Sequence, residues 1–239
     1  MFLESNNLRG ALFMSIAMAG YVSNDAIMKI VAPKTGLSQA IFIRGVFSSI
    51  FIALIFSITL RNIDECKAGF KKVLGRSFFD LLATIFFLTA LLNMPFANVN
   101  AILQALPLVV TIAASLVLKE SFGKKRAVAI ILGLMGVLLI IKPGTEGFNI
   151  YSLLALGAVL SVTCRDLLTR KMAQQIPAIF VSLVTSLVVT FSTGVYLMLN
   201  QNWQNADYYS IALLAISGLF LMTGYFFSVQ AMRYGSVAF

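Results

Sequence analysis

The stretch RGALFMSIAMAGYVSNDAIMK, residues 9–29, decides the fold class. It is apolar over most of its length, and a membrane helix needs about 20 such residues. It leads into Ser23-Asn24-Asp25 without a small-x-small cleavage site, which argues against a signal peptide. The stretch therefore predicts a transmembrane helix that carries an acidic side chain at membrane depth.

The rest of the chain has the same character. Of its 239 residues 59% are hydrophobic and only 11% are charged, whereas soluble domains have roughly 25% charged residues. Apolar stretches of membrane-spanning length occupy residues 10–31, 38–60, 77–93, 97–118, 126–142, 150–169, 177–199 and 209–232. The sequence predicts an all-α, polytopic membrane protein with eight transmembrane helices in a lipid bilayer.

The net charge of +9 does not indicate a nucleic-acid partner, because the basic residues lie in short loops and form no patch interleaved with aromatic residues. Most of them fall on one side of the predicted membrane, in loops 61–76 and 119–126 and at Arg9, Arg170, Lys171 and Arg233. Because cytoplasmic loops carry the excess of Lys and Arg, we expect a bacterial inner-membrane protein with its N-terminus in the cytoplasm.

A shift of 141 residues aligns the two halves of the chain, and it places Asp25 on Asp166 and Lys29 on Arg170. Loop 61–76 carries five basic residues and its counterpart 202–217 carries none. This inversion predicts inverted five-helix repeats, 10–142 and 150–239, as in secondary transporters. The second copy would then lack its last two helices of an expected ten; the alternative is a natural eight-helix protein.

Several segments resemble EamA-type carriers of the drug/metabolite transporter superfamily. Segments 9–14 and 23–29 resemble the first helix of these carriers, and Gly133, Gly136 and segment 138–144 look like the close of their first repeat. The resemblance implies a ten-helix carrier in which a small-molecule substrate binds between the repeats.

A narrower likeness concerns the substrate. Segments 101–107, 142–148 and 165–170 are similar to bacterial riboflavin uptake transporters, and Asn24-Asp25 and Asp166 also occur in S-adenosylmethionine uptake transporters. The resemblance implies riboflavin uptake, with S-adenosylmethionine uptake or efflux of amino acids and other metabolites as alternatives. A structural or channel-like membrane protein is the alternative from a different class.

Four ionisable residues, Asp25, Arg44, Arg165 and Asp166, fall inside the predicted helices, where charges are costly and usually face a cavity. Asp25 and Arg44 each lie about six residues, or roughly 9 Å, from the same surface. We expect them to form a polar cluster with Asn24 at the outer end of a substrate cavity; a structural ion pair is the alternative. Arg165 and Asp166 project about 100° apart, so at least one should face protein or water.

Gln104 lies three residues before Pro107 in the predicted fourth helix. Proline removes a backbone hydrogen bond and can open a membrane helix toward a cavity. Gln104 is therefore a candidate for a hydrogen bond to a heterocyclic substrate, or else for an interhelical hydrogen bond. Tyr225 and Gln230 form the analogous pair in the second copy.

The sequence offers no catalytic or metal-binding constellation. It contains no His, its two Cys are far apart, and no spacing fits metal ligands. Asp25 is predicted toward the outer side and Asp166 toward the inner side, so they do not form a catalytic pair. We therefore expect no enzyme, no cofactor and no metal, and the sequence carries no signal for an oligomeric state.

Overall fold

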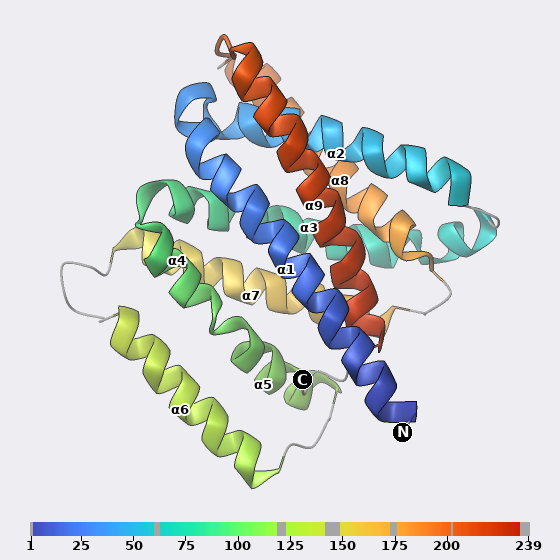
Figure 1. The fold of residues 1–239 in the computed structure, drawn as a ribbon, viewed down its shortest axis with the longest axis vertical. Helices are drawn as coiled ribbons and strands as arrows, with labels where there is room; N and C mark the ends of the chain where they lie inside the picture. The colour runs from blue at the N-terminus through green and yellow to red at the C-terminus, as the bar shows by residue number, and fades with distance from the viewer. Residues whose placement is uncertain are drawn as a thin grey trace.

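The structure, a computed structural model, describes residues 2–59, 63–118, 123–141, 149–172, 176–201 and 203–234. These residues are almost entirely helical (Figure 1). The helices are α1 (Phe2–Thr35), α2 (Leu37–Thr59), α3 (Ile63–Asn93), α4 (Phe96–Leu103), α5 (Leu106–Leu118), α6 (Lys124–Ile141), α7 (Ile150–Lys171), α8 (Ala178–Asn200) and α9 (Tyr208–Tyr234).

The predicted fourth transmembrane helix is divided into α4 and α5 by the turn at Gln104 and Ala105. Pro107 has no backbone N–H to donate to the carbonyl of Leu103, so the helical ladder is interrupted there. The Ala105 N–H bonds the Ile102 carbonyl at 3.0 Å, a tighter three-residue turn. The two helices together still form one apolar crossing, Phe96–Val117.

The eight predicted crossings are confirmed in the described part of the chain. Seven segments are long and apolar enough to cross a membrane, and α6 adds a shorter apolar segment, Ala127–Gly136. Helix α6 packs on α4 and α5 at the periphery of the bundle (Figure 1).

The prediction that residues 61–76 form a loop is wrong. Helix α3 begins at Ile63, and its apolar part already begins at Gly69. Arg76, which the charge count assigned to that loop, is buried and donates hydrogen bonds to Thr169 Oγ1 at 2.9 Å and Thr185 Oγ1 at 2.6 Å. These acceptors lie on α7 and α8, about 100 residues further along the chain, so local sequence gives no sign of them.

The inverted-repeat plan stays a prediction, and the arrangement of the helices agrees with it. Helix α2 and helix α8 have bounds that differ by the same 141 residues at both ends, and α3 and α9 end at equivalent positions. Helix α1 packs on α9, α3 packs on α7, and α2 packs on α8. Ser186 Oγ lies 3.5 Å from the carbonyl oxygen of its equivalent, Gly45, as expected close to an internal two-fold axis. The exact repeat boundaries, 10–142 and 150–239, stay a prediction.

Helices α1 and α9 approach each other closely at Gly20. A Cβ atom there would lie 2.8 Å from the Phe220 carbonyl oxygen and 3.1 Å from the Gly224 nitrogen. We expect Gly20→Ala to destabilise the protein by about 1–3 kcal/mol, because the backbones must separate. Thermal unfolding in detergent measures the change.

Gly136→Ala is the matched control for this substitution. Gly136 also lies inside a helix, but a Cβ atom there would have no neighbour within 4 Å. The control should be neutral or more stable by up to about 1 kcal/mol, the helix-propensity gain. Equal melting temperatures for the two variants would contradict the close packing of α1 on α9.

Candidate functional site

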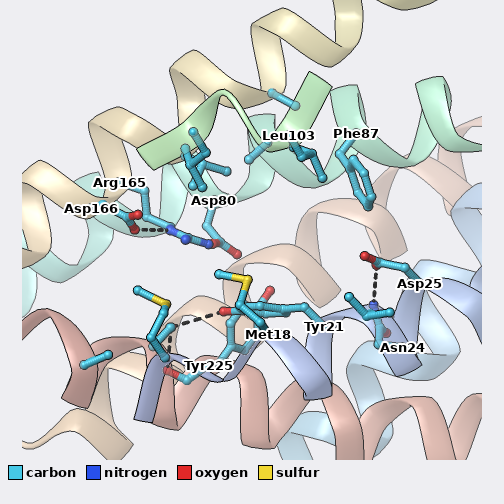
Figure 2. Close-up of a pocket in the computed structure, with 18 of the residues that line it drawn as sticks. Met18, Tyr21, Asn24, Asp25, Asp80, Phe87, Leu103, Arg165, Asp166 and Tyr225 are labelled. Carbon is cyan, nitrogen blue, oxygen red and sulfur yellow. Dashed lines mark hydrogen bonds and ion pairs between the residues drawn. The ribbon is translucent and has the colours of Figure 1, made fainter. Parts of the chain in front are cut away.

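A cavity of about 560 Å³ lies between α1, α2, α3, α7, α9 and the break between α4 and α5 (Figure 2). This volume falls within the range of small-molecule sites, roughly 300–1,000 Å³. Much of the wall is apolar, with side chains such as Met18, Phe87 and Leu103. Polar and charged groups form two separate clusters on it.

The first cluster is built around the amide of Asn24. Its oxygen accepts hydrogen bonds from Arg44 Nη1 at 2.9 Å and from Ser217 Oγ at 2.7 Å. Its nitrogen donates to Asp25 Oδ1 at 2.9 Å. The predicted cluster of Asn24, Asp25 and Arg44 therefore forms, and all three side chains line the cavity.

The direct ion pair between Asp25 and Arg44, which the sequence made feasible, does not form. Neither residue has an opposite charge within 4.0 Å among the described ion pairs. The Asn24 amide lies between them and bonds both. Arg44 Nε, like Ser48 Oγ, is buried and has no hydrogen-bond partner among the described residues.

The second cluster joins α3 to α7 through Arg165. Its Nη1 atom lies 2.8 Å from Asp80 Oδ1, and its Nε atom lies 2.9 Å from Asp166 Oδ1. All three side chains line the cavity and are nearly inaccessible to solvent. We expected at least one of Arg165 and Asp166 to face protein or water, and both do. Figure 2 shows this cluster at the opposite end of the view from Asp25.

Asp80 was missed by the sequence prediction. It lies within stretch 77–93 and four residues after Arg76, a spacing that places the two side chains on one face of a helix. A charge inside an apolar run is itself the signal of a cavity-facing group. Applied to stretch 77–93, that criterion would have found Asp80.

The remaining predicted residues separate into two groups. Gln104 lines the cavity at the break between α4 and α5, and Tyr225 lines it from α9. The Tyr225 ring lies edge-on to Tyr21, with centroids 6.2 Å apart. Gln230 is not among the lining residues, because five residues turn a helix about 140° away from Tyr225.

Asp25 and Asp166 both line the cavity, and Figure 2 shows them at opposite ends of the view, so their separation in depth stays a prediction. Together with Asp80, they give the wall three carboxylates against the two guanidinium groups of Arg44 and Arg165. No group of three or more His, Cys, Asp or Glu side chains in the described ranges is arranged to hold a metal ion. The wall is suited to bind a small molecule that has an apolar body and several hydrogen-bonding groups.

Comparison with known proteins gives a consistent result. The model of the EamA-like transporter family matches residues 8–142. The chain is 27% identical to the riboflavin transporter of Vibrio cholerae serotype O1 over 220 aligned residues. The alignment covers 90% of this chain and 73% of the relative. It is 24% identical to the S-adenosylmethionine uptake transporter of Rickettsia prowazekii over 216 aligned residues. That alignment covers 88% of this chain and 71% of the relative.

Proposed function

The chain belongs to the EamA-like transporter family, and from this premise we propose that it takes up riboflavin across the bacterial inner membrane. It is a multi-pass membrane protein of transporter type. Transport would proceed by alternating access, with one group of helices rocking against the other around a central site.

The observation that carries the proposal is the position of the cavity between the two repeats. Helices α1, α2 and α3 of the first copy and α7 and α9 of the second all contribute to its wall. Asp25 and Asp166, which are equivalent in the repeat, both line it. A binding site at the interface of inverted repeats is the arrangement that secondary transporters use.

Riboflavin is a flat, uncharged heterocycle with a hydroxylated side chain, and the cavity offers complementary groups. Met18, Phe87 and Leu103 supply an apolar slot, while Gln104 and the hydroxyl of Tyr225 can hydrogen-bond polar edges. The likeness to the riboflavin transporter of Vibrio cholerae supports the same substrate.

We place the N-terminus in the cytoplasm. Arg9, Lys71, Lys72 and Lys171 are exposed near helix ends that fall on the N-terminal side of the crossings, and such excess basic charge marks the cytoplasmic side. Fusion of alkaline phosphatase at Met172, after α7, is expected to remain inactive in the cytoplasm, whereas fusion at Gly36, after α1, should be active in the periplasm.

S-adenosylmethionine is the second candidate, and the state of Asp25 favours it. This carboxylate lines the cavity, and no described side-chain cation pairs with it, so it could pair the sulfonium or amino group of that substrate. The S-adenosylmethionine uptake transporters among the relatives point to the same candidate.

Uptake of labelled riboflavin by a riboflavin-requiring bacterial strain that expresses the full-length gene tests the assignment. Labelled S-adenosylmethionine is measured in parallel, with the empty vector as control. Riboflavin accumulation that unlabelled riboflavin competes away supports the proposal. Accumulation of S-adenosylmethionine alone would transfer the assignment to the second candidate.

Gln104→Leu tests the predicted hydrogen bond to the substrate. Loss of one hydrogen bond of about 0.5–1.5 kcal/mol should raise the KM for uptake roughly 2- to 10-fold. Gln230→Leu is the matched control, because Gln230 lies outside the cavity wall, and its KM should stay unchanged. Equal KM values for both variants would exclude Gln104 from the substrate site.

A further inference from the structure

Asp25 differs from the other two carboxylates of the cavity. Asp80 and Asp166 each contact the guanidinium group of Arg165, at 2.8 and 2.9 Å. Among the described residues Asp25 has no such partner: its side-chain hydrogen bond comes from the neutral amide of Asn24. Figure 2 shows its carboxylate directed into the cavity, with Phe87 nearby.

The two nearest candidates for a counter-ion are engaged elsewhere. Lys29 lies one helical turn after Asp25, but its ammonium group donates to the carbonyls of Leu91 and Met94 at the end of α3. Arg44 on α2 directs Nη1 to the oxygen of Asn24. Both cations are therefore held without contacting Asp25.

The other elements around the cavity provide no free cation in the described part of the chain. Helix α9 presents the neutral Tyr225, and α1 itself presents Tyr21 one turn earlier. Helix α3 presents Asp80, and α7 presents Arg165 with Asp166, which already form a cluster. The described residues of α5 include no charged side chain.

An unpaired carboxylate at this depth is costly, by about 2.5–3.5 kcal/mol on insertion scales, and binding a proton removes the charge. A metal cation is a poor alternative, since hard cations take about six oxygen ligands. The Asn24 oxygen already accepts hydrogen bonds from Arg44 and Ser217, so the site offers little beyond one carboxylate. The proton is the ligand that this environment suits.

We propose that Asp25 binds and releases the proton that drives uptake. The proposal rests on the transport function above. The Asp25 carboxylate takes a proton from the outer aqueous phase when the cavity opens outward, forming an O–H bond. The neutral acid accompanies the substrate through the rocking step. The O–H bond breaks toward the cytoplasm, so each cycle carries one proton inward.

Infrared spectroscopy tests proton binding without any substrate. The full-length protein in lipid is compared in acidic and alkaline buffer, and the carbonyl band of a protonated carboxylic acid is recorded. The acidic buffer is held at about pH 6, above the range near pH 4 in which ordinary exposed carboxylates take up a proton. There the wild type and Asp207→Asn should gain the band, and Asp25→Asn should lack it. Asp207 lies outside the membrane spans, and asparagine preserves its acceptor for the Ser210 N–H. A band that persists in Asp25→Asn would overturn the proposal.

Transport in proteoliposomes tests coupling separately, with labelled riboflavin and labelled S-adenosylmethionine as probes. An inward proton gradient should drive accumulation by wild type and Asp207→Asn. Asp25→Asn should fall to the level of empty vesicles, and substrate should no longer draw protons inward with it. Gradient-driven accumulation by Asp25→Asn would overturn the proposal. Failure of wild type to exchange either probe would instead count against the proposed function, and the infrared result would still decide proton binding.

Discussion

Replacing Arg165 by methionine is expected to destabilise the protein by about 3–5 kcal/mol and to abolish transport. Arg165 is the shared cation of Asp80 and Asp166, and removal of one partner leaves uncompensated buried charge. The cavity wall would also lose the contact between Asp80 on α3 and Arg165 on α7. Thermal unfolding in detergent and substrate uptake by cells measure the two effects.

Lys171→Met is the matched control for this prediction. It removes a cation from the same helix, but Lys171 is exposed at the helix end, and exposed charges contribute at most about 1 kcal/mol. A triple variant that combines Arg165→Met with Asp80→Asn and Asp166→Asn should regain part of the stability without regaining transport. If Arg165→Met and Lys171→Met have the same melting temperature, the buried cluster does not stabilise the fold.

The first polar cluster could be predicted from the sequence, because the number of residues to the end of a transmembrane helix gives the depth of a side chain in the membrane. Asp25 and Arg44 lie at similar distances from one surface, and both contact Asn24 in the structure. The count could not determine which groups bond directly, because that depends on side-chain geometry between helices. The Asn24 amide therefore occupies the position where a direct ion pair was feasible.

The second cluster shows the opposite case. Arg76 falls outside the predicted apolar stretch 77–93, among basic residues that were assigned to a loop. Asp80 lies inside that stretch, but the criterion of a charge at membrane depth was not applied to it. Their partners, Arg165, Thr169 and Thr185, lie about 85–109 residues away. Pairing at that separation follows from the packing of α3 on α7 and α8, which no local pattern encodes.

Equivalence between the predicted repeats identifies some residues of the cavity wall and not others. It makes Asp25 and Asp166 equivalent, and both line the cavity. Gln230 is predicted by analogy with Gln104, from its position along the chain alone. The direction in which its side chain leaves the helix was not part of that prediction. A rotation of about 140° from Tyr225 takes Gln230 out of the wall.

Pro107→Ala is expected to stabilise the protein and to impair transport. Alanine restores the N–H that can donate to the Leu103 carbonyl, and the helix-interior penalty of proline is about 3 kcal/mol, so α4 and α5 can merge into one helix.

Merging the two helices would move Gln104 and Leu103, which line the cavity at the break, and the uptake rate should fall roughly tenfold, equivalent to about 1.4 kcal/mol. Pro33→Ala is the control, because Pro33 lies inside α1, is exposed and does not line the cavity. The control should raise the melting temperature without slowing uptake. A Pro107→Ala protein that is more stable and transports at the wild-type rate would mean that the break is only tolerated, whereas a slower one would identify it as part of the transport machinery.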